Sequence, residues 1–335
     1  MKEQEIILKR HTDHRFVTRG ARQLILTATW LVLAAVFVLM ARSAPQAPNN
    51  QANTTQQPAP TDWKAVEQAL GKAGSMQPGD VYKVSLPRSD LKVTVSGLEL
   101  KPALALGSWV AFKKTGDMTM VMGDLVLTED EVMPVLTKLQ EGGVEQTALH
   151  NHVLHESPRV MYMHIHAMGD AVKVAQAIHD ALALSKTPFA ASAPSTSPTP
   201  ELGIDTTQLD QTLAQSGKLN GVVYQFSIPR AEKVMDAGME VPPSMGLATA
   251  INFQPTGSGK AAITGDFVLI ASEVNPVIKA LRDNDIEVTA LHSHMLTETP
   301  RLFFMHFWAN NDAQKLARGL RAALDKMNIV KAQGK

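Results

Sequence analysis

An internal repeat constrains the fold of this chain more than any other feature. Residues 123–182 align with residues 265–324 without a gap, at an offset of 142 residues, and 28 of the 60 positions are identical. A duplication explains this similarity, and it predicts two similar domains that pack against each other around a pseudo-two-fold axis. The total length of 335 residues also suits two domains better than one.

Each copy predicts the same order of secondary structure. Apolar periodicity and turn signals indicate an opening helix, several strands, a helix that begins after Thr128 and ends at Gly142, two more strands, and a last helix. Glu131 completes a capping box with Thr128. The order predicts an α+β fold, with two tandem duplicated antiparallel-sheet domains in a loosely ferredoxin-like layer and helices packed on one face. The other elements expected in the first copy are a helix at 62–73, strands at 92–98, 108–112 and 118–127, and strands at 145–153 and 159–167 joined near Ser157–Pro158.

The N-terminal part of the chain predicts a membrane anchor. Leu24–Met40 is seventeen residues long without a charge, which is near the lower limit for a membrane-spanning helix. Six basic residues precede it and only Arg42 follows closely, so the positive-inside rule places the N-terminus in the cytoplasm and both domains outside, tethered to the inner membrane. Small residues at 41–43 leave open a second possibility, a cleaved signal peptide and a periplasmic protein.

The composition between these elements indicates linkers. Residues 43–61 and 185–203 are rich in Pro, Ser, Thr and polar residues, which bury little apolar surface and form flexible tethers. The expected organisation is a basic cytoplasmic segment (1–22), a membrane segment (23–41), a tether (42–61), the first domain (62–184), a linker (185–203) and the second domain (204–327).

Charge and cysteine content exclude several classes of protein. Lys+Arg and Asp+Glu are both 32, so the formal net charge is zero, and a nucleic-acid partner is not expected. The chain has no cysteine, so disulfides, thiolate metal ligands and cysteine nucleophiles are excluded.

The histidines gather in two matching phrases. The phrase "ALHNHVLHESPRVMYMHIHA" (148–167) holds five of the eleven histidines, and "ALHSHMLTETPRLFFMHFWA" (290–309) holds three. Residues i and i+2 of a strand share a face, so a hairpin of the two predicted strands brings His150 opposite His164, with Met163 on the other face. Clustered imidazoles suit a transition metal, zinc first, with a site in each copy. The expected ligands are His150, His152, His164 and His166 in the first copy, and His292, His294 and His306 in the second.

Charged residues beside these phrases are candidates for catalysis. If the protein is an enzyme, a metal-activated water is the reagent in a hydrolysis, and Glu156 or Glu298 is the general base. Arg159 or Arg301 then holds an anionic group. The competing hypothesis is a non-catalytic sensor, or an anion-binding or partner-binding module, in which the histidines are structural.

Other polar residues have weaker interpretations. Asp124 and Asp266 each follow a glycine; turn chemistry is the expected role, and membership of the histidine site is the alternative. Arg88 and Arg230 each follow a proline; they are expected to be exposed, and anion binding is the alternative. Trp308 replaces His166 in the second copy, so that copy is expected to be poorer in ligands.

The two histidine phrases and the helix between the strands ("GDLVLTEDEVMPVLTKLQEGG" in the first copy) are similar to the LppY/LpqO family of exported bacterial proteins, of unknown function. The resemblance covers roughly residues 62–324. It implies export and a duplicated domain, and it implies no activity. Because the chain has no cysteine, it has no lipobox, and a membrane helix is expected to replace the lipid anchor.

Overall fold

A computed structural model describes residues 63–190 and 202–331 of the chain. The expected cytoplasmic segment, membrane segment and first tether lie outside the described residues. Within the described ranges, no helix is long and apolar enough to cross a membrane.

The first copy forms a six-stranded antiparallel sheet in the order β1-β2-β5-β6-β9-β7. Strand β6 is buried almost throughout because both faces of the sheet are covered, and its nearly continuous apolar sequence reflects this. The strands are β1 (Ser75–Gln77), β2 (Val81–Pro87), β5 (Gly107–Thr115), β6 (Met118–Thr128), β7 (Glu145–His150) and β9 (Val160–Gly169), and the helices are α1 (Trp63–Leu70), α2 (Pro102–Ala105), α3 (Glu129–Glu141) and α4 (Ala171–Leu182).

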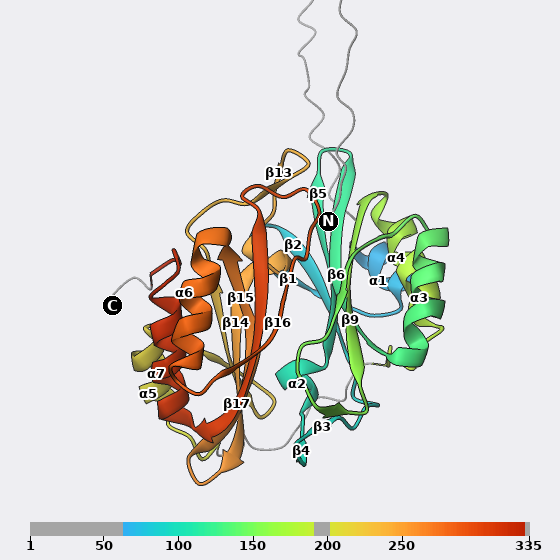
Figure 1. Cartoon of the computed structure of the whole chain (residues 1–335). Coiled ribbons are helices and arrows are strands. Elements are labelled where there is room, and N and C mark those ends of the chain that lie inside the picture. The colour runs from blue at the N-terminus through green and yellow to red at the C-terminus, as the bar shows by residue number, and fades with distance from the viewer. Residues whose placement is uncertain (1–62, 191–201, 332–335) are drawn as a thin grey trace, which may run out of the picture. The chain divides into compact units, whose positions relative to one another are not determined.

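The second copy repeats this sheet in the order β10-β11-β14-β15-β17-β16 (Figure 1). All its neighbouring strands are antiparallel. The strands are β10 (Lys218–Asn220), β11 (Val223–Pro229), β14 (Ala248–Gly257), β15 (Lys260–Ile270), β16 (Glu287–His292) and β17 (Leu302–Asp312), and the helices are α5 (Thr206–Leu213), α6 (Ala271–Arg282) and α7 (Ala313–Leu324).

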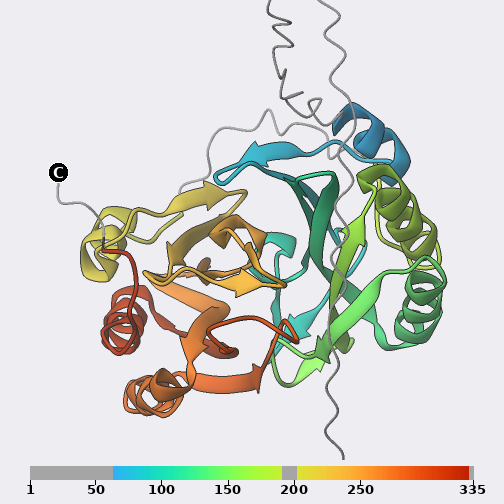
Figure 2. The ribbon, with the colours of Figure 1, turned by 90° about the horizontal axis from the view of Figure 1, so that it is seen from above.

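The two sheets pack face to face, with the longer helices on the outside (Figures 1 and 2). One hydrophobic core lies between each sheet and its own helices. Two further cores contain residues of both copies and fill the space between the sheets, with Met122 and Phe304 in one and Tyr162 and Ala262 in the other. The duplicated antiparallel-sheet domains with helices on one face are therefore present, and the second face of each sheet is covered by its partner.

Short segments that leave each main sheet contact the other copy. In the first copy, β3 (Thr94–Val95), β4 (Leu98–Glu99) and β8 (Glu156–Ser157) form a small sheet beside α2. The main chain before and within α2 bonds to the other domain, because the Gln254 side chain accepts a hydrogen bond from Lys101 N and donates one to Glu99 O. In the second copy, β12 (Met235–Asp236), β13 (Met239–Glu240) and η1 (Pro243–Met245) occupy the corresponding place. Both copies thus contribute to one shared interior.

The secondary structure agrees with the sequence in the main and differs in particular places. The strand expected at 92–98 is the short β3–β4 hairpin outside the main sheet, because Ser96 and Gly97 both have positive φ and form a turn. Strand β2 was not anticipated, although its sequence VYKVSLP buries alternate residues. Residues 185–190 of the expected linker pack on the first domain, where Lys186 N donates to the Glu131 carboxylate.

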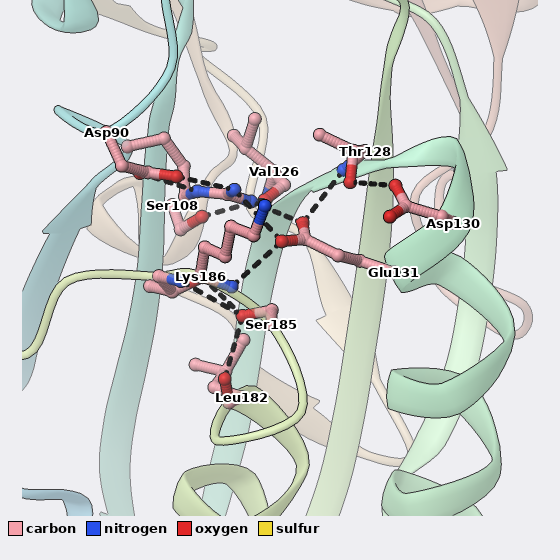
Figure 3. A network of polar contacts seen from close by, with 11 residues as sticks. Asp90, Ser108, Val126, Thr128, Asp130, Glu131, Leu182, Ser185 and Lys186 are labelled. Atoms are coloured by element: carbon pink, nitrogen blue, oxygen red, sulfur yellow. Dashed lines mark hydrogen bonds and ion pairs between the residues drawn. The ribbon is translucent and has the colours of Figure 1, made fainter.

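Arg88 and Arg230 are buried, contrary to expectation. Arg88 is 0% exposed, and its guanidinium donates to the Glu131 and Asp90 carboxylates and to Val126 O. Figure 3 shows Glu131 at the centre of this network, where it also accepts from Thr128 N as the capping box requires. Arg230 makes the same contacts with Glu273 and Val268 O in the second copy. These arginines bind the sheet to the first turn of helix α3 or α6 and are not available to an anion.

Candidate metal centre

Six histidines, three from each copy, meet in one cluster between the two sheets. Three pairs of histidines join the two copies at close range, and in each pair the two imidazole rings stack on each other. The centroid distances are 3.5 Å for His150–His292, 3.8 Å for His152–His306 and 3.6 Å for His164–His294. The sequence had placed one site in each copy. Because the sheets pack face to face, the two sets lie in contact.

Strands place the histidines at corresponding positions in the two copies. His164 and His306 lie within β9 and β17, while His150 and His292 end the edge strands β7 and β16. The segment after β7 is held by the edge strand β16, since Asn151 donates from Nδ2 to Thr289 O (3.2 Å) and Thr289 donates from Oγ1 to His152 O (2.5 Å).

The face of each strand was predicted correctly, but the register was not. His150 pairs with Tyr162, and His164 pairs with Ala148, so the two strands are offset by two residues from the expected pairing. Met163 packs in the core beneath the helices, as the alternation of the strand requires.

Two aspartates from the central strands complete the cluster. Asp124 of β6 has carboxylate oxygens 3.8 Å from His152 Nε2 and 3.9 Å from His164 Nε2. Asp266 of β15 has one carboxylate oxygen 3.5 Å from His294 Nε2. Turn chemistry was the expected role for both, and the structure instead places them in mid-strand, facing the imidazoles. Each is paired across the sheet with a cluster histidine, His164 or His306, on a strand distant in the sequence, so no local pattern showed this contact.

A glycine beside each aspartate allows the strands to approach closely. A Cβ on Gly265 would lie 1.9 Å from the carbonyl oxygen of Ala250 on the next strand. The carbonyl of Gly265 in turn accepts a hydrogen bond from His306 Nδ1 at 2.7 Å. In the second copy the Gly-Asp pair therefore orients a ring as well as supplying a carboxylate.

Burial controls the charge of the cluster. It lowers the pKa of His150 to about 4 and that of His292 to about 3, and it holds the pKa of the other four rings well below 6.5. Burial also raises the pKa of Asp124 to about 8, although Lys83 opposes this shift. All six imidazoles are therefore neutral at pH 7, which is the form that binds a metal ion.

Most of the donor atoms in the cluster have no partner. The Nε2 atoms of all six histidines, and one oxygen each of Asp124 and Asp266, are buried and accept no hydrogen bond from the described residues. The Nδ1 atom of His150 donates to Asn151 O, as that of His306 does to Gly265 O, so the free Nε2 atoms of these two rings carry lone pairs. Buried polar atoms without partners cost about 1–3 kcal/mol each, so several at one point indicate a ligand. Imidazole nitrogens and carboxylate oxygens fit a transition metal ion.

His166, the seventh expected ligand, lies apart from the six. Its Nδ1 atom is 3.5 Å from the Glu145 carboxylate, and its Nε2 atom is 3.7 Å from that of Asp236. It belongs to neither of the two groups of donors that lie within 4.8 Å of one another. The replacement of His166 by Trp308 in the second copy thus leaves the six-histidine cluster complete.

The turn residues expected to act in catalysis have different surroundings in the two copies. Glu298 is buried and accepts from Leu302 N, and Arg301 donates to Glu298 and to the carbonyls of Met295 and Leu296. These contacts fix the turn around Pro300. Glu156 and Arg159 instead line a cavity of about 180 Å³, together with Asn151, Val153, Leu154, His155 and Met161. Among the described residues, no hydrogen bond or ion pair joins any of the four to the cluster histidines.

The fold and this cluster together define a duplicated-domain protein with a histidine-rich centre between two facing sheets. The chain belongs to the family described as Domain of Unknown Function (DUF1259), whose model matches residues 64–184 and again residues 207–326. The double match agrees with the duplication seen in the sequence and in the sheets.

Other comparisons add little. No curated protein matches the chain. Among solved structures, a trimeric bacterial microcompartment shell protein, PduB, is 12% identical, covering 78% of this chain and 97% of its own, with a TM-score of 0.21. EtuB from Clostridium kluyveri is 10% identical, covering 76% of this chain and 91% of its own, with a TM-score of 0.18. Similarity this low carries no argument about function.

Proposed function

We propose that this protein binds a transition metal between its two domains, through the six-histidine cluster and its two aspartates. One observation supports the proposal above the rest: six buried Nε2 atoms, and one buried oxygen each of Asp124 and Asp266, have no hydrogen-bond partner among the described residues. A purely structural role would require those atoms to be bonded to protein groups, as buried polar atoms normally are.

The donor set favours zinc among the candidate metals. Neutral imidazole suits zinc, copper, iron and nickel, and a carboxylate beside it is compatible with zinc. Because the chain has no cysteine, the soft thiolate sites of zinc fingers and iron–sulfur clusters are excluded. The metal would fasten the two domains together, since each copy supplies three of the six rings.

Purified metal-free protein is expected to take up Zn²⁺ and to become more stable by about 4 kcal/mol when free zinc is about a thousand times the Kd. Only the folded state presents the cluster, so binding adds to the free energy of unfolding. The full chain should be purified without a histidine tag, stripped with a chelator, reloaded, and examined by elemental analysis and urea unfolding.

Two variants control this measurement. His306→Phe removes a buried ligand and should abolish most of the stabilisation by zinc. His155→Asn changes a histidine outside the cluster whose φ of +60° asparagine tolerates, and it should leave the stabilisation intact. Equal behaviour of the two variants, or failure of the native chain to retain any transition metal, would contradict the proposal.

A binding module is the preferred form of this function, and metal-dependent hydrolysis is the second candidate. The Nε2 atoms of the cluster are buried from water, which favours a closed coordination shell. The observation in favour of hydrolysis is the cavity that Glu156 and Arg159 line, because it includes Asn151, the residue between His150 and His152. In such an enzyme Arg159 would hold an anionic group and Glu156 would act as the general base.

Cobalt substitution separates these two functions. The visible spectrum of Co²⁺ depends on its ligands, so adding azide to the Co²⁺-loaded protein should leave the spectrum unchanged if the shell is closed. A spectral change at millimolar azide would show an open position and would favour the enzyme. Arg159→Gln serves as the control, because it should weaken an anion effect that passes through the cavity.

The cellular location also belongs to this proposal. Leu24–Met40 and the resemblance to the LppY/LpqO family support an inner-membrane anchor with both domains outside the cytoplasm, or a periplasmic protein after signal cleavage. Metal would then be acquired outside the cytoplasm.

A further inference from the structure

We propose that the cluster holds two metal ions side by side, a dinuclear centre with one ion from each copy's ligand set. This inference rests on the proposed function, because it specifies how many ions bind and which residues hold each. It concerns the six cluster histidines, Asp124 and Asp266.

The number of donors exceeds what one ion needs. A protein-bound zinc ion takes four ligands in a tetrahedron. The cluster offers six imidazole nitrogens and two carboxylates, which is two complete sets of four. A single ion would leave about half of these buried donors without a partner, at a cost of about 1–3 kcal/mol for each atom.

The donors divide naturally by copy. His150, His152 and His164 have ligand atoms within 4.8 Å of one another, and Asp124 approaches two of these rings. His292, His294 and His306 form an equally tight group, and Asp266 approaches His294. The duplication therefore builds the same set twice: two histidines separated by one residue, a third from the adjoining strand, and an aspartate from the strand beyond.

The two sets are neighbours, so their ions would form one centre. His150 lies within the same 4.8 Å limit of the second group, and its ring stacks on that of His292 at 3.5 Å. Dinuclear sites in enzymes place their ions about 3.5–4 Å apart.

The carboxylates distinguish one ion from two. The main alternative is a single ion held by the four imidazoles of His150, His292, His294 and His306. That ion would leave both carboxylates unligated. In the dinuclear arrangement each ion has a carboxylate of its own, so each buried ion is paired with an opposite charge.

Counting zinc in the full chain and in two variants tests the inference. The metal-free protein should bind about two equivalents of Zn²⁺. A first-set variant (His152→Phe with His164→Phe) and a second-set variant (His294→Phe with His306→Phe) should each bind about one equivalent. The phenylalanines fill the vacated volume, and circular dichroism checks the fold.

The possible outcomes are distinct. One equivalent in the native chain, with one retained in the first-set variant and none in the second, would establish the single four-imidazole ion and overturn the dinuclear centre. No zinc in the native chain would overturn the proposed function itself.

A second measurement does not depend on the variants folding. The native chain is loaded with Cu²⁺, its copper content is measured, and its paramagnetic resonance spectrum is recorded. Two Cu²⁺ ions a few ångströms apart couple through space, so the spectrum should be broadened and should show a half-field transition. Two bound ions whose spectrum lacks both features would be isolated ions and would overturn the inference.

Discussion

Replacing Arg88 by alanine is expected to lower the free energy of unfolding by about 3–5 kcal/mol, because the substitution leaves a buried carboxylate without its counter-charge. Arg88 is 0% exposed, and its Nη1 atom lies 2.7 Å from Glu131 Oε2. It also donates to Val126 O at 2.7 Å, which ties strand β6 to the start of α3. Urea unfolding of the native chain and the variant, both with metal removed, measures the difference.

Two comparisons make this prediction specific. Arg230→Ala removes the equivalent ion pair with Glu273 in the second copy, where Nη1 and Oε2 are 2.6 Å apart, and should cost a similar amount. Lys138→Ala removes an exposed pair with Glu141 and should leave the free energy of unfolding nearly unchanged. A loss below about 1 kcal/mol for Arg88→Ala would contradict a structural role for the buried pair.

Acid is expected to destabilise the metal-free protein steeply below pH 6.5. Burial lowers the pKa of His150 to about 4 and of His292 to about 3, while the unfolded chain titrates near 6.5. Between these values the unfolded state binds a proton that the folded state does not, so stability falls by about 1.4 kcal/mol per pH unit for each such histidine. The other four rings act in the same direction, because burial lowers their pKa as well.

The two aspartates change the pH dependence of stability in the opposite direction, and their effect is smaller than that of the six histidines. Burial raises the pKa of Asp124 to about 8 and that of Asp266 well above 3.8, so the folded state holds protons that the unfolded state releases. Their contribution is complete below the unfolded pKa and is lost as the pH rises through the folded value. Six histidines against two carboxyls leave a net loss of at least about 3 kcal/mol from pH 6.5 to 5.5, and the stability maximum should lie near pH 6.5.

Urea unfolding at a series of pH values with a chelator present measures this dependence. In a variant with His150→Phe and His292→Phe, two of the titrating groups are absent, and the slope below pH 6.5 should be smaller by about 2.7 kcal/mol per pH unit. The same slope in the native chain and the variant would mean that these rings are not buried and neutral in the folded state.

The sequence alone was sufficient for the repeat and for much of its local structure. The offset of 142 residues established the duplication, because two copies of a folding unit keep the residues that its core and its turns require. The capping box at Thr128 is a local signal, and the structure has it. Alternation also showed that His164 and Met163 point to opposite faces, since that follows from the geometry of a strand.

The tertiary structure decided what those faces meet. No pattern in one copy showed that its histidine face packs on the histidine face of the other, so the two expected sites became one cluster. The aspartates had been assigned to turns because Gly-Asp is a turn signal, yet cross-strand pairing in the sheet places them against the rings. Arg88 and Arg230 had been expected at the surface, and burial beside Glu131 and Glu273 depends on helices that pack from elsewhere in the chain. Local periodicity determines the side of a helix or strand on which a residue lies. What that side packs against depends on residues far away in the sequence, so no short stretch of the sequence shows it.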